Sequence, residues 1–169
     1  MAQRLHEISL DEANRRFVPD EVFETAAVAA EVIADLTECI RTGEGPQVYA
    51  ILLRDGALIG HVQAVPLEEG WEIGYHIGGE YAGCGYATEA VQAFLPVIMK
   101  RLSIQKMLGV CLADNHASRR VMEKVGFIKQ YEGQGDYQGD QRLICRYQYE
   151  YHLRPPFWAA SIHGILKGK

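Results

Sequence analysis

Hydrophobic and polar positions repeat along the chain with two different periods. In TAAVAAEVIADLTECIRTG, apolar residues recur at helical spacing and Gly43 follows the last of them, which predicts a helix. WEIGYHIG alternates instead, with Glu72 and His76 on the same face, which predicts a strand. From Ala87 the helical period returns, and Pro96 is expected to kink this helix.

The remaining stretches complete an α/β pattern. A hairpin that turns at Asp55 and Gly56 precedes the alternating strand, and SLDEANRRF predicts a helix near the N-terminus. QKMLGVCLA reads as a buried strand. NHASRRVMEKVG then predicts a short helix that begins at the N-cap Asn115 and stops at Gly126. The last third predicts two strands, so the whole order predicts an α/β fold with one mixed sheet.

Length and composition indicate one domain. With 169 residues, of which 48% are hydrophobic, the chain can bury one core, which we assign to residues 1–154. Two prolines open the tail at residues 155–169, which carries an apolar group. We expect this tail to dock on the same chain; packing on a second subunit and an origin in an expression vector are the alternatives.

Charge and hydropathy narrow the partners. No segment has the roughly 18 uninterrupted apolar residues of a membrane span, and the N-terminus lacks the apolar centre of a signal peptide, so we expect a cytoplasmic protein. We expect it to be a monomer or a homodimer. A net charge of -5 argues against nucleic acid and is compatible with a cationic ligand. The four cysteines lack the paired spacing of zinc sites, so no metal is expected.

The stretch GEYAGCGYATEAV places three glycines between the alternating strand and the following helix. Free backbone N–H groups at a helix N-terminus favour a phosphate, and glycine lets an anion approach closely. A dinucleotide fingerprint would need glycine or alanine where the chain has Thr88, and the Gly-Lys-Ser/Thr of a mononucleotide loop is absent here. Another phosphate ligand and a plain tight turn remain as interpretations.

Two motifs in order carry a family resemblance. IGYHIGGEYAGCGYATEAV is followed, after one helix and one strand, by ADNHASRRVMEKVGF. The pair resembles the GNAT superfamily of acetyl-CoA-dependent N-acetyltransferases, in particular its ribosomal-protein N-terminal acetyltransferase-like branch. The resemblance covers about residues 47–127. The family's loop begins with glutamine or arginine, whereas this chain has Ala82.

The resemblance implies a GNAT fold with two splayed parallel strands and a site for acetyl-CoA. Amides of the loop would hold the CoA pyrophosphate, at Gly83, Cys84, Gly85, Tyr86, Ala87 and Thr88. The pantetheine arm would pair with the backbone of the first splayed strand, at Tyr75, His76 and Ile77. Asn115 would contact the arm from the other side, and Arg120 would face the 3′-phosphate.

The implied reaction is acetyl transfer to a primary amine without a covalent enzyme intermediate. Some relatives carry a glutamate five residues before the asparagine, where this chain has Val110. We therefore expect Glu72, through a water, to be the base, with His76 as the alternative. Many relatives use a tyrosine seven residues after the asparagine to protonate the CoA thiolate, where this chain has Met122. In the similar branch a serine takes this role, which implies Ser118; its alternative is to position the helix or the pantetheine.

Two classes of function stay open. The intact glycine loop and Asn115 favour an active enzyme that acetylates a peptide N-terminus, polyamine, aminoglycoside or other small amine. Ala82 and the missing strand glutamate favour a GNAT-fold module that binds CoA or an amine without catalysis. A nicotinamide-dependent enzyme is a third reading. Trp71 and Tyr75 are expected to pack in the core, and Tyr137 to contact substrate or lie on the surface.

Overall fold

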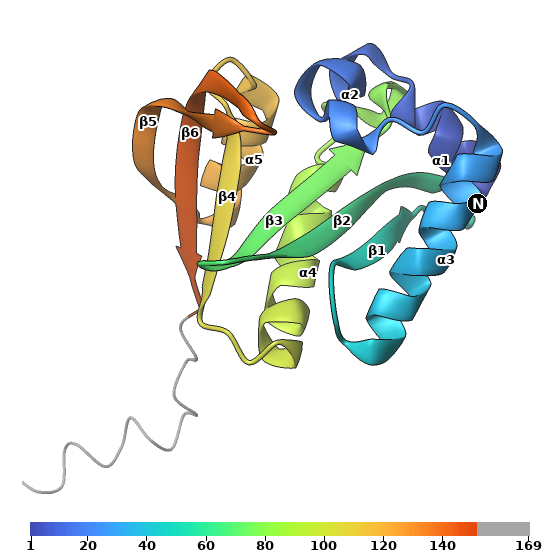
Figure 1. Cartoon of the computed structure of the whole chain (residues 1–169), viewed down its shortest axis with the longest axis horizontal. Coiled ribbons are helices and arrows are strands. Elements are labelled where there is room, and N and C mark those ends of the chain that lie inside the picture. Colours follow the sequence, from blue (N-terminus) through green and yellow to red (C-terminus); the bar gives the residue numbers. More distant parts are fainter. Residues whose placement is uncertain (152–169) are drawn as a thin grey trace, which may run out of the picture.

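Six strands form one mixed sheet in the computed structural model, which describes residues 1–151 (Figure 1). The strands are β1 (Gln47–Leu52), β2 (Leu58–Leu67), β3 (Gly70–Ile77), β4 (Lys106–Leu112), β5 (Ile128–Tyr137) and β6 (Asp140–Glu150). Their order across the sheet is β1-β2-β3-β4-β6-β5. Neighbours are antiparallel except for β3 and β4, which are parallel. The mixed α/β sheet expected from the sequence is confirmed.

The helices cover both faces of this sheet. They are α1 (Ala2–Ser9), α2 (Glu12–Phe17), the short 3₁₀ helix η1 (Pro19–Glu21), α3 (Ala26–Thr42), η2 (Gly79–Tyr81), α4 (Tyr86–Arg101) and α5 (His116–Val125). α4 packs on β2 and β3 and α5 on β4 and β5, whereas α1 packs on β2 and α3 on β1. Val62 joins the core beneath α4, but its neighbour His61 contacts Glu21 of η1. Because adjacent strand residues point to opposite faces, η1 lies across the sheet from α4.

The N-terminal helix differs from the expectation. The stretch that predicted one helix from Ser9 is divided between α1, which already begins at Ala2, and α2. The Ser9 hydroxyl donates to the His6 carbonyl at 2.8 Å and accepts a hydrogen bond from the Phe23 N–H at 3.0 Å. These bonds tie Ser9 to the end of α1 and to the chain before α3, so the serine ends a helix where the pattern suggested a beginning.

The predicted longer helices are confirmed. Thr25 caps α3, since its hydroxyl oxygen accepts from the Val28 N–H at 3.2 Å, and Gly43 ends it in the left-handed conformation with φ 79°. α4 continues through Pro96 to Arg101. α3 therefore ends at the residue that the sequence predicted, and Pro96 does not end α4.

One apolar cluster joins α4 and α5 to the sheet. Its buried residues include Val62, Ala64, Ile73, Val91, Phe94, Leu95, Ile98, Met99, Met107, Cys111, Met122, Phe127 and Tyr147. Trp71 and Tyr75 pack against this cluster, as predicted. The odd-numbered residues of β3 thus face the helices, which leaves Glu72 and His76 on the opposite face.

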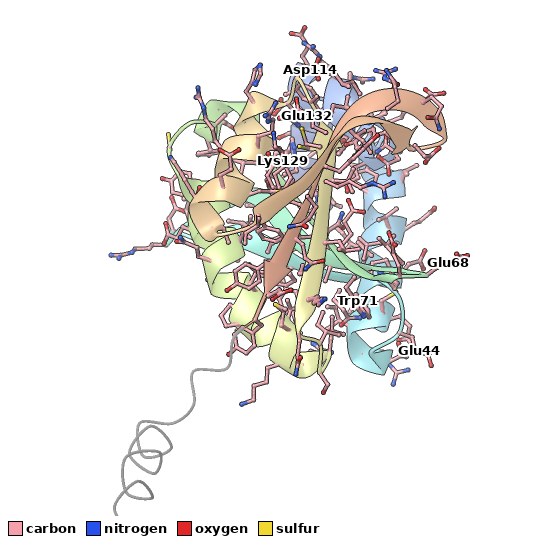
Figure 2. The ribbon with its side chains drawn as sticks, turned by 90° about the vertical axis from the view of Figure 1, so that its left-hand side faces the viewer. Glu44, Glu68, Trp71, Asp114, Lys129 and Glu132 are labelled. Carbon is pink, nitrogen blue, oxygen red and sulfur yellow. The ribbon has the colours of Figure 1, made fainter. Side chains whose placement is uncertain are left out.

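Residues 11–21, which contain α2 and η1 and are here called the N-terminal arm, are tied to the ends of both parallel strands. The Asp11 carboxylate accepts a hydrogen bond from the Gly79 N–H, just after β3, at 2.6 Å. Arg16 pairs with Asp114, just after β4, at 2.7 Å. Figure 2 shows Asp114 at one end of the sheet and Trp71, near the start of β3, toward the other. The arm therefore crosses the end at which the two strands stop.

Two further expectations concern the chain as a whole. The apolar tail at residues 155–169 lies outside the described residues, so its docking stays a prediction. Within residues 1–151, no helix combines the length and apolar character needed to cross a membrane.

Candidate active site

The parallel strands β3 and β4 diverge. Glu72 and Leu108 form the one residue pair in the ladder between them, although both strands continue beyond it. Figure 1 shows β3 (green) leaning away from β4 (yellow) toward the ends that the N-terminal arm covers. A cavity of about 1610 Å³ occupies the cleft and reaches from the loop before α4 to the β5–β6 turn. The splayed pair expected from the sequence is present.

The loop before α4 offers unpaired amides. Gly83 and Gly85 have φ of 78° and 90°, which glycine adopts without strain, and a Cβ atom on either would meet nothing within 4 Å. Gly85 is the N-cap of α4, and no side chain caps the helix. The first N–H groups of α4 therefore lack a helical partner and lie at the positive end of the helix dipole, the arrangement that binds phosphate groups.

The structure brings most of the predicted CoA residues to the cavity. Those that line it are Tyr75, His76, Ile77, Gly83, Gly85, Tyr86, Ala87, Thr88, Asn115, Ser118 and Arg120. Cys84 is the exception, because it does not line the cavity; the residue is exposed, and its Sγ lies 3.7 Å from the Ala82 carbonyl oxygen.

Basic residues of α5 divide between two environments. Arg119 donates to the Ala113 carbonyl at 2.9 Å and pairs with Glu132 at 3.4 Å. Arg120 and Lys124 line the cavity instead. Arg120 is therefore better placed than its neighbour Arg119 to meet an anion in the cleft.

Asn115 has the capping role that the sequence predicted. Its Oδ1 accepts a hydrogen bond from the Ser118 N–H at 3.0 Å, at the start of α5. The side-chain amide of Asn115 keeps its N–H donors, and the residue lines the cavity. One residue can therefore cap the helix and donate to a ligand at once.

Ser118 lies against Tyr75 across the cleft. The two hydroxyl oxygens are 2.9 Å apart, and the Tyr75 hydroxyl also donates to the Ser118 carbonyl oxygen at 3.0 Å. Burial raises the pKa of Tyr75 well above its ordinary value, so the phenol is neutral. The alternating pattern placed Tyr75 on the helix face, but no sequence signal pairs its hydroxyl with a residue 43 positions away.

Glu72 lies where the two strands are still paired. Burial raises the pKa of its carboxyl to about 7, although a hydrogen bond from the Val110 backbone and the charge of Arg146 both oppose this. Near neutral pH the group therefore exists in both protonation states, which suits a general base. Val110 stands at the position where some GNAT relatives have a glutamate, so Glu72 reaches the same part of the cleft from the other strand.

A hydrogen-bonded network that the sequence did not predict lies beside Glu72. The Glu21 carboxylate accepts a hydrogen bond from Gln63 Nε2 at 2.6 Å and pairs with His61 Nε2 at 3.0 Å. Burial opposes the ionisation of Glu21, but the bond to His61, its charge and the bond from Gln63 hold the pKa of Glu21 below its usual value. Gln63 lies over Gly74, where a Cβ would come within 2.7 Å of its Nε2. The only sequence signal was the shared face of His61 and Gln63 within a buried strand.

His76, the alternative base, has poor surroundings for that role. Burial and then the neighbouring His61 lower the pKa of His76, and its Nε2 is buried with no hydrogen-bond partner among residues 1–151. The histidine is therefore neutral near pH 7. His76 lines the cavity, but the pKa of Glu72, at about 7, suits a general base better.

The β5–β6 turn closes one side of the cleft. The Tyr137 hydroxyl donates to the Phe17 carbonyl at 2.7 Å, and the Gln138 side-chain amide bonds to Asp20. Both contacts join the turn to the N-terminal arm. Tyr137 lines the cavity. Burial, and then the negative charge of Glu72, raise the pKa of the Tyr137 hydroxyl. Of the two expectations for Tyr137, a place inside the cleft fits the structure better than surface display.

The described residues offer no grouping for a metal. Within residues 1–151, no three His, Cys, Asp or Glu side chains come together closely enough to hold an ion. All four cysteines are free thiols.

Comparisons with known proteins agree with this geometry. The model of the acetyltransferase (GNAT) domain family matches residues 2–128. The uncharacterized N-acetyltransferase YnaD of Bacillus subtilis is 29% identical over 131 residues, which cover 76% of this chain and 74% of that protein.

Solved structures share the fold. The chain superimposes on a GNAT-family acetyltransferase from Bacillus anthracis with a TM-score of 0.72 and 23% identity, over 88% of each chain. It superimposes on RimL, a ribosomal L7/L12 alpha-N-protein acetyltransferase solved in complex with coenzyme A, with a TM-score of 0.73 and 20% identity, again over 88% of each chain.

Proposed function

Because the chain belongs to the acetyltransferase (GNAT) family and is thus an acetyl-CoA-dependent N-acetyltransferase, we propose that it acetylates a primary amine by direct attack on the thioester. The acceptor is the N-terminus of a peptide or the amine of a small molecule. No covalent enzyme intermediate is required, because both substrates meet in one cleft.

The acetyl-CoA site combines the loop and the splayed strands. Backbone amides at residues 83–88 bind the pyrophosphate, and Arg120 faces the 3′-phosphate. The pantetheine arm lies between β3 and β4, paired with the backbone of Tyr75, His76 and Ile77 and approached by the Asn115 amide from α5. An amide of β3 that faces the thioester oxygen stabilises the oxyanion, a contribution of about 3 kcal/mol in comparable sites.

The observation that carries the proposal is the Glu72 carboxyl at the point where β3 and β4 separate. The attacking amine must be neutral, and a carboxyl with a pKa of about 7 can take its proton, directly or through a water. A peptide α-amino group has a pKa of about 7.7–8.0, whereas a lysine side chain has about 10.4. The close match favours an α-amine or a similarly weak base as acceptor. The similarity in fold to RimL, a ribosomal L7/L12 alpha-N-protein acetyltransferase, supports the same class.

Ser118 assists the departure of CoA. A thiol has a pKa near 8.5 and is a far stronger acid than an alcohol, so Ser118 has little tendency to give up its proton completely. We therefore assign it a hydrogen bond to the leaving sulfur, which stabilises the thiolate, while the proton that the sulfur finally takes comes from solvent. The resemblance implied that Ser118 donates a proton to the thiolate; we assign it a hydrogen bond only.

The Glu72→Gln variant tests the base. With acetyl-CoA and a panel of peptides and amines, release of the CoA thiol should fall by about 100-fold in kcat/KM, the usual scale for a general base. Both the base and the attacking amine must lose a proton, so the parent profile should fall more steeply on the acid side than the variant profile, which keeps only the limb of the amine. Glu68→Gln, an exposed neighbour in the turn before β3, is the matched control and should behave as the parent. An unchanged rate and profile in Glu72→Gln would remove Glu72 from the mechanism.

A further inference from the structure

The hydroxyl of Tyr75 links the two walls of the cleft. It comes from β3, whereas both of its partners, the Ser118 carbonyl oxygen at 3.0 Å and Ser118 Oγ at 2.9 Å, belong to α5. The tyrosine ring packs against the apolar core, so its position is fixed from behind. The hydroxyl is therefore held at the one serine to which we assign a contact with CoA.

Ser118 is itself fixed by its surroundings. Its N–H donates to the Asn115 cap at 3.0 Å, and its carbonyl lies inside α5, where the helical pattern supplies a donor four residues later. These contacts leave open the direction of the side-chain O–H bond. The Cys111 thiol lies near it, but within residues 1–151 the Tyr75 hydroxyl is the group at hydrogen-bond distance from Ser118 Oγ.

Two arrangements of the protons satisfy the observed distances. In the first, Tyr75 donates to the Ser118 carbonyl and the Ser118 O–H points back at the tyrosine oxygen. In the second, Tyr75 donates to Ser118 Oγ, and the Ser118 proton is free to point into the cleft. Hydrogen bonds in such a chain polarise one another, so an anion in the cleft favours the second arrangement.

We propose that Tyr75 is a positioning residue for acetyl transfer, because its hydroxyl donates to Ser118 Oγ and directs the Ser118 proton at the departing sulfur of CoA. The inference rests on the proposed function. As the tetrahedral intermediate collapses, the C–S bond breaks and its electron pair goes to sulfur. Ser118 and Tyr75 both keep their protons, and the thiolate is protonated later by solvent.

The acidities of the groups agree with this division of roles. A phenol has an ordinary pKa near 10 and a thiol one near 8.5, and burial raises the pKa of Tyr75 further. Transfer of the tyrosine proton to the thiolate is therefore uphill, so Tyr75 acts through the hydrogen bond alone. Many relatives have a tyrosine on the helix where this chain has Met122, which has no hydroxyl. Here Tyr75, from β3, supplies a hydroxyl near the leaving sulfur through Ser118.

A double-mutant cycle on Tyr75→Phe and Ser118→Ala tests the inference. Phenylalanine keeps the ring, so the fold should persist, and the melting temperature of each variant checks this. We expect Tyr75→Phe to lower kcat by about 5-fold and to leave the KM for acetyl-CoA within about 2-fold, as expected for one lost hydrogen bond. In the Ser118→Ala background the same change should have no further effect, because its target is gone.

Tyr147→Phe is the matched control. Tyr147 belongs to the same core, where it is more deeply buried than Tyr75, and its hydroxyl contacts Glu123 at 3.3 Å rather than Ser118. Its loss should lower the melting temperature but leave kcat unchanged. Effects of Tyr75→Phe that multiply with those of Ser118→Ala, or that equal those of Tyr147→Phe, would make Tyr75 a purely structural residue.

A second readout does not depend on turnover. The pKa of the thiol of bound CoA, followed by the ultraviolet absorbance of the thiolate, should be lower in the parent than in Tyr75→Phe or Ser118→Ala. Equal thiol pKa values in the parent and Tyr75→Phe would overturn the inference even if the enzyme is active. A parent that binds CoA but acetylates no amine would instead overturn the proposed function.

Discussion

Glu72 works against the stability of the protein at the pH at which it would act. Its carboxyl is buried between two strands, and the compensating groups, the Val110 amide and the charge of Arg146, do not restore its ordinary acidity. A buried group whose charged form is poorly solvated costs free energy whenever it ionises. Ionisation of Glu72, at the point where β3 and β4 separate, therefore destabilises the folded state.

The pH dependence of stability follows with a definite sign. The folded pKa of about 7 lies above the ordinary value of 4.5, so the native state binds more protons between these values and the parent loses stability as pH rises through this window. Glutamine does not ionise, so the Glu72→Gln variant does not lose this stability as the pH rises. The variant should gain up to about 3 kcal/mol over the parent at about pH 8, and almost nothing at about pH 4.

Denaturant unfolding of both proteins at the two pH values measures this difference. A variant that is no more stable than the parent at the higher pH would show that the carboxyl is well solvated in the fold. The same variant should lose activity, so stability and catalysis should change in opposite directions.

Gly85 bears directly on the phosphate-binding role of the loop. Its φ of 90° is nearly that of Gly56, which is 88° in the β1–β2 turn, and a Cβ at either position meets nothing within 4 Å. Valine at both sites should therefore cost similar stability through the backbone alone. Only Gly85→Val should also weaken acetyl-CoA binding, by at least about 10-fold, because its side chain occupies space that the pyrophosphate needs.

Calorimetric titration with acetyl-CoA compares the two variants. Equal affinities for Gly85→Val and Gly56→Val would place the pyrophosphate somewhere other than this loop. Melting temperatures show whether the backbone cost is shared, as the matching φ values require.

At the scale of elements, the β5–β6 turn and the N-terminal arm together bound one side of the cleft, and we propose that the acceptor amine binds on this side. Tyr137→Phe removes the bond to the Phe17 carbonyl and should raise the KM of the acceptor by about 5-fold, since one hydrogen bond between the two elements is lost. The affinity for acetyl-CoA should not change. Tyr131→Phe is the control, because that hydroxyl bonds to the Gln134 carbonyl within β5. A rise in acceptor KM that is equal in both variants would count against a role for this closure.

Elements whose signals are local could be predicted from the sequence. The β3 alternation, the glycine loop and the Asn115 cap each depend on residues a few positions apart, and all three are present. The break between α1 and α2 was missed because the Ser9 hydroxyl that ends α1 bonds to Phe23, outside the pattern. Local period and capping describe neighbours in the chain, not partners in space.

Contacts between distant segments could not be predicted for the same reason. Tyr75 meets Ser118 only because α5 packs over the splayed strands, and Glu21 meets Gln63 only because η1 lies across the sheet. The alternating pattern predicted that Tyr75 packs in the core, but it gave no distance to Ser118, and nothing in the pattern predicted the contact of Glu21 with Gln63. The raised pKa of Glu72 likewise depends on burial that only the assembled fold creates.

At the scale of the whole molecule, charge is divided along the cleft. Arg120 and Lys124 line the cavity on the α5 side. Asp20, Glu21 and Glu72 line it on the side of the N-terminal arm, although Arg146 and Lys106 also line the cavity and Arg146 acts on Glu72. A phosphate-bearing cosubstrate and a cationic amine would therefore each approach the surface of opposite charge. The two substrates would enter from opposite faces of the sheet and meet in the opening between β3 and β4.

The most direct test of the account is the release of the CoA thiol by the parent protein with acetyl-CoA, measured with and without an amine. The account predicts that peptides with a free N-terminus raise the rate well above that with acetyl-CoA alone, and that the same peptides with a blocked N-terminus do not. If acetyl-CoA binds but no peptide or small amine of the panel raises the rate, the chain is a GNAT-fold binding module and the proposed catalysis is wrong.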